Sequence, residues 1–197
     1  MNKNTLALLK NELKEYEGAL SVFEMKEQQL KEAVQLAEQS VIRLNSEIEA
    51  TNSVVYNWSA VINDQQVDLK QLVKLNAVKT RYKEVAGTTI EVFEEILFEK
   101  TEIDFFNTPL WVDSAEGVLI DQKTRSVMLD IEQRNMEALL EELAEARRMK
   151  NALKEVFIPE TSQQIRKIEI YLGDVERLAI GCAKLVKKKK ELKKMNS

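Results

Sequence analysis

Few residues in this chain have the type and spacing that chemistry requires. It contains no histidine, so the commonest metal ligand and general base is missing. The single cysteine, Cys182, excludes an internal disulfide and fits a reducing compartment; its place on an apolar stripe favours a buried small hydrophobe over a nucleophile. The sequence has no glycine-rich phosphate loop, no G-x-S-x-G, no H-E-x-x-H and no paired cysteines. It therefore predicts a protein with no catalytic residues, cofactor or metal.

Charged side chains, 31% of the chain, are predicted mainly to solvate helix faces. Carboxylates recur at helical surface spacing, so no catalytic pair stands out. The sharpest charge feature is "KLVKKKKELKK" at residues 184–194. It fits a helix end whose dipole attracts cations, and the alternative is binding to an anionic surface or to phosphates. The net charge of −4 and the lack of interleaved aromatic residues disfavour a nucleic-acid platform.

Composition points to long helices. Only 5 glycines and 2 prolines interrupt 197 residues that are rich in Glu, Lys, Leu and Ala, which is typical of coiled coils. No uncharged apolar run of about 18 residues exists, so no segment is predicted to enter a membrane. The first residues mix acids and bases, and they are not expected to form a signal peptide.

An apolar stripe with alternating spacings of three and four runs through the N-terminal arm. Such a sustained period of 3.5 indicates a left-handed supercoil against a partner helix, whereas the alternative, an ordinary amphipathic helix on a globular core, drifts toward 3.6. Glu27 and Thr51 are the two breaks in the stripe. The stripe comprises Leu6, Leu9, Leu13, Tyr16, Leu20, Phe23, Leu30, Val34, Ala37, Val41, Leu44, Ile48, Val55 and Trp58.

The C-terminal arm is predicted to begin near Asp113, as an N-cap with Glu116 three residues later. Its stripe changes frame by one residue at Pro159. We interpret Pro159 as a kink in a continuous helix, pressing near Gly18, because no turn residue precedes it; the alternative is two helices joined by a tight turn. The first frame holds Leu129, Met136, Leu139, Leu143, Ala146, Leu153 and Phe157, and the second holds Ile158, Thr161, Ile165, Ile168, Leu172, Val175, Ala179, Cys182 and Val186.

The middle segment differs in composition from the two arms, because it is rich in β-branched and aromatic residues. Partial alternation on both sides of "AGTT" predicts a β-hairpin over residues 76–98 that turns at Gly87. A short helix is expected over residues 65–75, and an ordered connector at "FFNTPLWVD", where Pro109 forces Thr108 into extended geometry. We expect the hairpin to bind a small partner because its apolar residues are too few to bury both faces; these are Ile90, Val92, Phe93, Ile96, Leu97 and Phe98.

The predicted fold is mainly α: a long antiparallel two-helix coiled coil with a small central insert that contains the β-hairpin. Residues 1–62 form the N-terminal coiled-coil helix, residues 63–112 a central foot, and residues 113–197 the C-terminal coiled-coil helix. Together they make a single elongated domain, and the two long helices are expected to pair within one chain.

The segment "RMKNALKEVFIPETSQQIRKI" resembles the signature of the D subunits of V-type and A-type ATPases. "LALLKNELKEYEGALSVFEMKEQQLKEAV" looks like the opening helix of that family, and "TPLWVD" like a connector in its bacterial branch. The sequence departs from the signature where Met149 and Lys150 replace an arginine and a valine, and where Lys154 replaces an acid. The matching signature positions are Arg148, Asn151, Ala152, Leu153, Ile158, Pro159, Ile165, Arg166, Lys167 and Ile168.

The resemblance implies the central rotor shaft, or stalk, of a V/A-type rotary ATPase. Such a shaft hydrolyses nothing itself; it couples ATP synthesis or hydrolysis in the catalytic A/B ring to proton or sodium translocation. The implied partners are the A, B and F subunits and the socket subunit (C/d) above the membrane rotor ring. The implied location is cytoplasmic and peripheral to the membrane, with no nucleic acid bound.

Two other classes of function remain as alternatives. A coiled-coil scaffold or tether without a rotary role predicts self-association through the heptads. An RNA-binding helical hairpin predicts strongly salt-dependent binding that is lost when the lysine-rich run is removed.

Overall fold

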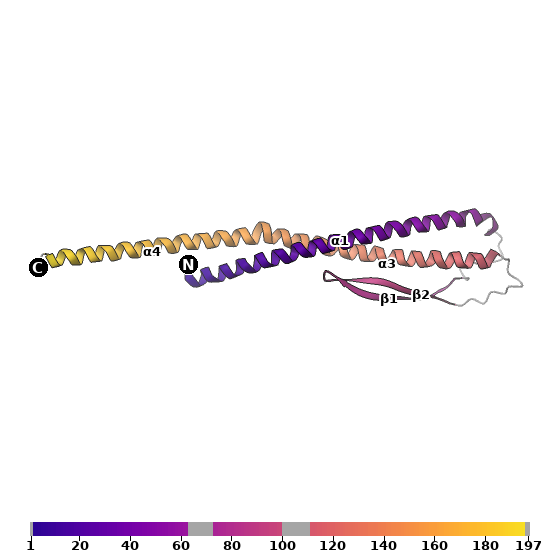
Figure 1. The fold of residues 1–197 in the computed structure, drawn as a ribbon, viewed down its shortest axis with the longest axis horizontal. Coiled ribbons are helices and arrows are strands. Elements are labelled where there is room, and N and C mark those ends of the chain that lie inside the picture. Colours follow the sequence, from indigo (N-terminus) through magenta and orange to yellow (C-terminus); the bar gives the residue numbers. More distant parts are fainter. Residues whose placement is uncertain (1, 63–72, 100–110, 196–197) are drawn as a thin grey trace. The chain divides into compact units, whose positions relative to one another are not determined.

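The computed structural model describes residues 2–62, 73–99 and 111–195. Helix α1 spans Lys3–Ile62, strand β1 Leu75–Val85, strand β2 Thr88–Phe98, and helix α3 Trp111–Ala152; a π-helical turn, Leu153–Phe157, then leads into helix α4, Ile158–Met195 (Figure 1). The predicted fold class is confirmed, with long helices on both sides of an antiparallel hairpin. None of the described helices combines the length and apolar character that a membrane span requires.

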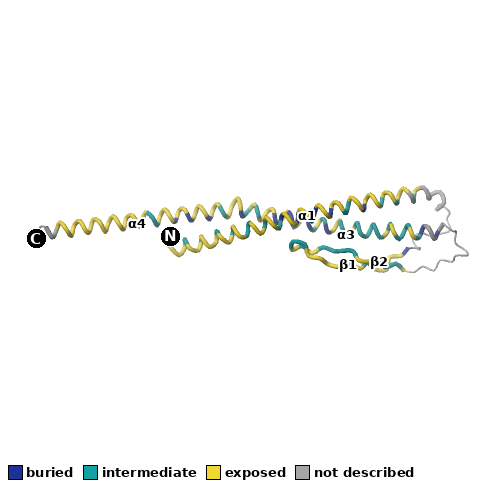
Figure 2. The backbone as a smooth tube through the Cα atoms, in the orientation of Figure 1, coloured by how far each residue is buried: buried dark blue, intermediate teal, exposed yellow. Residues whose placement is uncertain are grey.

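The chain divides into two compact units, and both long arms contribute to each. Unit 1 consists of residues 1–25 and 146–197, and unit 2 of residues 26–145. Both contain a stretch of α1 antiparallel to a returning helix. Because every third or fourth residue of α1 is apolar, one face of that helix is buried or half-buried while the other faces are exposed (Figure 2).

The largest fully buried side chains among the described residues lie in unit 2. Leu30 on α1 has 0% of its surface exposed, and it belongs to a core of apolar side chains from α1 and α3. Burying a leucine of this kind contributes roughly 1.5–3 kcal/mol, so the seam between these helices contributes strongly to the stability of the unit. The buried apolar residues of this seam are Leu30, Val34, Ala37, Leu44, Ile131, Leu139 and Leu143.

The two polar breaks in the α1 stripe both have partners. Glu27 is buried, and its carboxylate forms an ion pair with Lys31, the Nζ–Oε1 distance being 2.7 Å. The hydroxyl of Thr51 donates to the carbonyl of Glu47 and accepts from Nη1 of Arg125 at 2.9 Å. A buried polar group is tolerated when it is hydrogen-bonded, and both residues meet this condition.

The hairpin follows the sequence pattern closely. β1 and β2 are antiparallel, Val85 pairs with Thr88, and the two-residue turn has positive φ at both positions, 51° at Ala86 and 86° at Gly87. Positive φ at both central residues defines a type I′ turn, whose twist matches that of the flanking strands. The predicted hairpin and its turn are therefore confirmed, with the first strand beginning one residue earlier at Leu75.

Two expectations on either side of the hairpin fall largely outside the described residues. Residues 65–72 of the expected short helix are not described, and Leu75 at its end begins β1. The expected connector lies outside them up to residue 110. The predicted N-cap at Asp113 is wrong: α3 begins at Trp111, which places Asp113 in the first helical turn.

A small cluster fixes the base of the hairpin to the start of α3. Val73 and Val112 are buried against each other, with Phe98, Leu119 and Ile120 packed around them. Nζ of Lys123 also donates to the carbonyl of Val73 at 3.2 Å. These contacts hold the base of the hairpin next to the start of α3.

Unit 1 pairs the first part of α1 with the π-helical turn and α4. Nζ of Lys10 lies 2.6 Å from Oε1 of Glu169, and Nζ of Lys3 lies 3.5 Å from Oε1 of Glu176, so the two helices run antiparallel. The rings of Tyr16 and Phe157 are 5.6 Å apart. The buried residues of the returning helix in this unit are Ala146, Leu153, Thr161, Ile165 and Ile168.

The change of frame at Pro159 occurs within a continuous helical segment. The N–H of Ile158 donates to the carbonyl of Leu153, five residues earlier, in the π-helical turn Leu153–Phe157. A π turn holds one more residue than an α turn, so the buried face passes from Leu153 to Thr161 without rotating away. Pro159 lies just after the π-helical turn, where the regular i→i−4 hydrogen bonding is already interrupted, so a residue without N–H is tolerated there.

The expected close approach to Gly18 is wrong. Gly18 is exposed, and a Cβ built on it meets no atom within 4 Å. The frame change is absorbed by the π-helical turn itself, so no small residue is needed opposite it.

Candidate functional site

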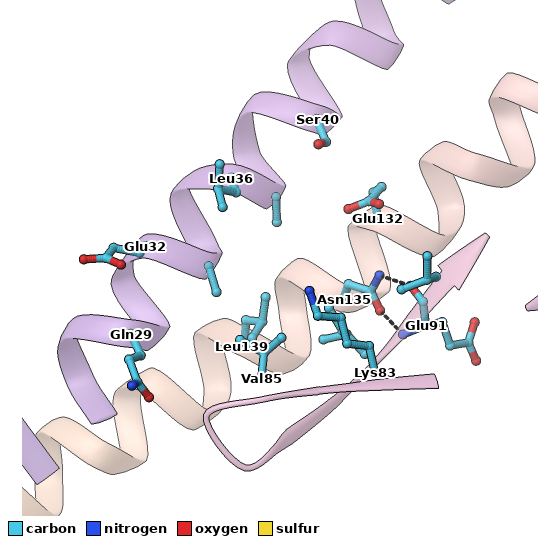
Figure 3. A pocket seen from close by; sticks show the side chains of 14 residues that line it. Gln29, Glu32, Leu36, Ser40, Lys83, Val85, Glu91, Glu132, Asn135 and Leu139 are labelled. Carbon is cyan, nitrogen blue, oxygen red and sulfur yellow. Dashed lines mark hydrogen bonds between the residues drawn. The ribbon is translucent and has the colours of Figure 1, made fainter. Parts of the chain in front are cut away.

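Asn135 fastens β2 to α3. Its side chain is buried; Nδ2 donates to the carbonyl of Glu91 at 2.7 Å, and Oδ1 accepts from the N–H of Glu91 at 2.8 Å (Figure 3). A neighbouring β-strand would make the same pair of contacts, so the amide side chain replaces a third strand at this point of the edge. Nη2 of Arg134 adds an ion pair to Oε2 of Glu91 at 3.3 Å. The hairpin is thereby held beside α3 near its turn as well as at its base.

A groove of about 340 Å³ lies between α1, α3 and the hairpin (Figure 3). Its apolar lining comes from all three elements, and polar side chains stand around it. Leu36, on the α1 side, has 65% of its surface exposed, so the apolar surface continues outside the groove. The lining residues are Gln29, Glu32, Ala33, Leu36, Ala37, Ser40, Lys83, Val85, Ile90, Glu91, Val92, Glu132, Asn135 and Leu139.

Glu132 is the carboxylate of the groove whose negative charge is least balanced by neighbouring groups. It is half-buried, and burial raises its pKa above the ordinary value, an effect that the charge of Arg43 only partly offsets. It makes no hydrogen bond or ion pair with another described residue. Glu32, by contrast, accepts from Nε2 of Gln28 at 2.8 Å, and Glu91 is paired with Arg134.

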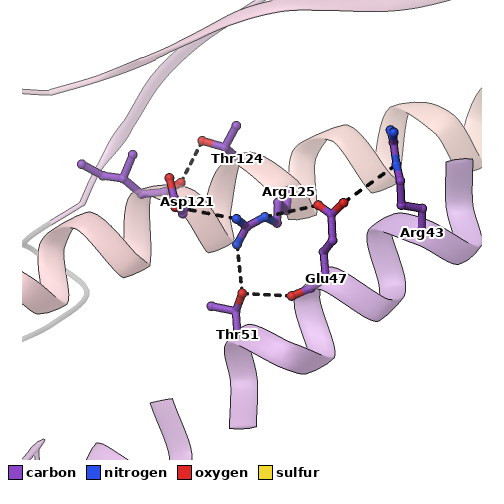
Figure 4. Close-up of polar contacts among 7 residues, drawn as sticks. Arg43, Glu47, Thr51, Asp121, Thr124 and Arg125 are labelled. Carbon is purple, nitrogen blue, oxygen red and sulfur yellow. Dashed lines mark hydrogen bonds and ion pairs between the residues drawn. The ribbon is translucent and has the colours of Figure 1, made fainter. Parts of the chain in front are cut away.

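A polar network centred on Arg125 connects α3 to α1 farther along unit 2 (Figure 4). Its guanidinium lies 3.5 Å from Oε2 of Glu47 and 3.7 Å from Oδ2 of Asp121, and it donates to Thr51 at 2.9 Å. Arg43 approaches Glu47 at 3.9 Å. Partly exposed ion pairs contribute only about 0–1 kcal/mol each, so this network adds little to the stability that the packed seam supplies.

The end of α4 has exposed apolar residues. α1 begins at Lys3, which pairs with Glu176, and α4 continues to Met195. Leu172 is half-buried, but Val175 is 44% exposed and Leu178 is 69% exposed. The predicted stripe is thus wrong from Val175 onward. Lys3 at the start of α1 pairs with Glu176, so no described residue of α1 covers Leu178 and the positions after it. Exposed large apolar residues here are Val175, Leu178, Ile180, Leu185, Val186 and Leu192.

Cys182 and the lysines of the run also lie on this exposed stretch. Cys182 is exposed, so its expected burial is wrong for the same reason. Lys184 and residues 187–190 are exposed on the helix. No group of three or more metal-binding side chains occurs among the residues that the structure describes.

The hairpin residues expected to bind a partner are partly used within the chain. Ile90 and Val92 line the groove, and Phe98 packs on the cluster at the base of the hairpin. Phe93 and Ile96 are half-buried. Phe98 is therefore packed within the chain, whereas Ile90 and Val92 line an open groove.

The residues of the signature lie on both sides of the π-helical turn. Leu153 is buried and Ala152 is half-buried, whereas Arg148 and Asn151 are exposed. Ile158 is half-buried and Pro159 is exposed. Apart from Pro159, the apolar members of the signature thus face the helix seam of unit 1, and the polar members face outward.

Sequence reasoning missed Asn135, Glu132 and Arg125. One signal was available for Asn135, which lies four residues from both Ile131 and Leu139 and so is a polar residue on the buried face of α3. Glu132 and Arg125 look like ordinary surface charges in the sequence, and only the hairpin and α1 packed beside them give them special surroundings.

Comparison with known proteins identifies the family of the chain. The family of ATP synthase D subunits matches residues 5–188. The V-type ATP synthase D subunit of Borreliella burgdorferi is 28% identical over 197 residues, covering 100% of this chain and 97% of the relative. The proteins of the same description from Chlamydia pneumoniae and Chlamydia caviae are 21% and 25% identical, covering 98% and 100% of this chain and 94% and 96% of the relatives. The chain, matched over almost its whole length, therefore belongs to the family of ATP synthase D subunits.

Proposed function

We propose that the protein is the central rotor shaft of a V/A-type rotary ATPase, mechanically coupling ATP synthesis or hydrolysis in a ring of A and B subunits to ion translocation. The observation that carries the proposal is the family match over residues 5–188, together with relatives named as V-type ATP synthase D subunits. The shaft transmits torque and leaves the chemistry of ATP to the ring. It acts in the cytoplasm, peripheral to the membrane.

The helical construction supports this mechanical role. In each unit, α1 lies antiparallel to a returning helix, and the seam of unit 2 is packed with buried leucine, valine and isoleucine side chains. Close-packed interiors are hard to compress, so a rotation imposed on one helix is passed to its neighbour. The interdigitated side chains of the seam also resist sliding of the two helices, and the polar network of Arg125 adds contacts between them.

We assign different partners to different surfaces. The exposed apolar residues of α4, from Leu178 to Leu192, would enter the ring of A and B subunits, where apolar side chains lose their contact with water. The hairpin and the helices beside it would contact two further proteins, the F subunit and the socket subunit above the membrane rotor ring. The lysines at the end of α4 would keep this stretch soluble before assembly.

Single-molecule rotation tests the proposal against a static scaffold. The chain would be assembled with the other subunits of its own complex, with Cys182→Ser and Thr89→Cys placing the only cysteine next to the exposed turn of the hairpin. A bead attached at residue 89 should rotate in one direction when ATP is added to complexes immobilised through the ring. ATP hydrolysis with a stationary bead would refute the shaft and favour the scaffold.

A further inference from the structure

The outer edge of β1, the edge that faces away from β2, carries backbone groups without a neighbouring strand among the described residues. In a two-residue hairpin the residues that flank the turn, here Val85 and Thr88, exchange hydrogen bonds, and bonded pairs then alternate with unbonded ones along the ladder. The N–H and carbonyl groups of Thr80, Tyr82 and Glu84 therefore point outward. No other described residue forms a hydrogen bond with these outward groups.

The opposite edge of the hairpin is covered by the chain itself. Glu91 of β2 is paired with Tyr82, so its N–H and carbonyl also point outward, and Asn135 of α3 binds both of them at 2.8 and 2.7 Å (Figure 3). A two-stranded hairpin alone is marginally stable in water, and a third strand or a packed helix normally completes it. Helix α3 completes the β2 side in this way, whereas the β1 side has no such neighbour in the part of the chain that the structure describes.

The side chains of β1 indicate what a third strand would carry. Tyr82 has 67% of its surface exposed, and an aromatic side chain on a strand is stabilised when a neighbouring strand covers it. On the other face of β1, Nε of Arg81 lies 3.6 Å from Oε1 of Glu94 across the hairpin. Lys83, two residues later, is exposed and forms no ion pair with a described residue. A carboxylate on the third strand would supply that pair.

A second copy of this chain does not fit the edge. Two β1 strands that overlap antiparallel over Leu75–Val85 would place Arg81 opposite Lys79 of the other copy, and a parallel arrangement in register would place each cation beside its equivalent. Charged side chains on an edge strand oppose such self-pairing. The β2 strand of a second copy is not free either, because α3 binds Glu91 there. A helix would leave the outward groups of β1 unpaired, since its own backbone groups are bonded internally.

We propose that the outer edge of β1 binds an extended segment of another protein as a third strand. The segment would exchange backbone hydrogen bonds with residues 80–84, place an aspartate or glutamate beside Lys83, and cover Tyr82 with an apolar side chain on the other face. Strand addition of this kind derives affinity from backbone bonds and specificity from alternate side chains. The inference concerns the mode of binding and stands whether or not the assembly is a rotary ATPase.

Site-specific photo-cross-linking of the full chain in its own cells identifies the segment. The photoreactive residue p-benzoylphenylalanine would replace Tyr82, and a control chain would carry it at Tyr56, an exposed tyrosine of α1. Sequencing the product of the Tyr82 chain should show a segment of another protein with an aspartate or glutamate within two residues of the cross-linked position. The Tyr56 chain should not capture that segment.

A proline distinguishes a strand from any other bound segment. Glu84→Pro in the Tyr82 cross-linking chain removes one outward N–H, whereas the matched Glu84→Ala change keeps it. The proline variant should give a yield about tenfold lower than the alanine variant, as expected for one lost backbone hydrogen bond. Proline is accepted on an edge strand where its N–H faces solvent, so the hairpin should persist. Amide exchange at Arg81 and Lys83, whose N–H groups are bonded within the hairpin, should be equally slow in both variants and checks this.

Charge reversal supplies an independent test that leaves the backbone unchanged. Lys83→Glu should lower the yield about fivefold, because it replaces an attractive cross-strand pair with a repulsive one. Lys14→Glu, an exposed change on α1, should leave the yield unchanged. The absence of a polypeptide product, a product with a second copy of this chain, a captured segment without an acid, equal yields from the two Glu84 variants, or an unchanged yield in Lys83→Glu would each overturn the inference. An acidic strand from a protein outside any rotary ATPase would support the inference and count against the proposed function.

Discussion

Asn135 on α3 makes two hydrogen bonds to the backbone of a single residue of β2, Glu91, at 2.7 and 2.8 Å. The two residues are 44 positions apart in sequence, and the contact joins the hairpin to the helix that follows it. The outward-facing edge of a strand normally pairs with another strand or with water. Here one amide side chain takes that place, so the backbone contact of β2 with α3 near the turn depends on a single residue.

We therefore expect Asn135→Leu to loosen the hairpin without unfolding the helices. The change leaves the N–H and carbonyl of Glu91 without their partner, at a cost of about 1–3 kcal/mol. Amide hydrogen exchange at Glu91 should accelerate by about tenfold or more. Gln133→Leu, an exposed change on the same helix, is the control. Exchange at Glu91 that is the same in both variants would mean that the base of the hairpin alone holds it.

The π-helical turn gives a prediction about chain length. The change of frame needs one extra residue, so Pro159→Ala should retain the turn and change the free energy of unfolding by less than about 1 kcal/mol, since Pro159 follows a π turn that already interrupts the regular helical hydrogen bonding. Deleting Glu155 should remove the π turn while keeping Thr161 and Ile165 on the buried face. It also places the proline inside a regular helix, which costs about 3 kcal/mol.

A thermodynamic cycle of these variants tests whether the π turn depends on the extra residue or on the proline. Pro159→Ala should recover most of the lost stability in the chain without Glu155, and should have little effect in the full-length chain. Denaturant unfolding followed by circular dichroism measures all four free energies. If Pro159→Ala changes the free energy of unfolding equally with and without Glu155, the hypothesis that the apolar stripe determines the π turn, and the proline does not, is contradicted.

The raised pKa of Glu132 predicts how the stability of the fold changes with pH. Burial raises its folded-state pKa above 4.5, the ordinary value expected in the unfolded chain, so its contribution is complete below pH 4.5 and is lost as the pH rises through the folded-state pKa. Glu132→Gln should consequently raise the melting temperature at pH 7, and this gain should disappear toward pH 4. Arg43 opposes the effect, because its charge favours the ionised carboxylate.

Melting curves of the Glu132→Gln and wild-type chains between pH 4 and pH 8 measure this dependence. Glu137→Gln provides the matched control, an exposed carboxylate on the same helix. A Glu132→Gln gain that is independent of pH would show that the substitution acts through packing and not through titration.

The exposed end of α4 should matter for function and not for folding. Residues 178–192 are exposed, so a chain that ends at Arg177 should have an unfolding free energy within about 0.5 kcal/mol of the full chain. In the assembled complex, the same truncation should lower the ratio of ions moved to ATP hydrolysed, because the proposed contact with the ring is lost. Normal coupling in a complex containing the truncated chain would place torque transmission elsewhere.

The sequence by itself determined the local elements of this protein. The alternation of apolar positions in α1 marks the face on which Leu30, Val34 and Leu44 are buried, because an α-helix repeats its faces every 3.6 residues. The turn at Ala86 and Gly87 is equally local, since a glycine tolerates positive φ at no steric cost. The one-residue change of frame near Pro159 was visible too, but its cause was not: a kink and a π turn produce the same pattern of apolar residues.

Only the tertiary structure decided what lies beside these elements. The stripe of α4 continues past Leu172, yet its residues are exposed there because α1 begins at Lys3 and the described residues offer nothing to cover them. Asn135, Arg125 and Glu132 gain their contacts or their altered pKa from segments distant in sequence, namely β2, α1 and the groove between them. Periodicity reports which face of a helix is apolar, but burial and ionisation depend on the atoms that pack against that face, and those come from elsewhere in the chain.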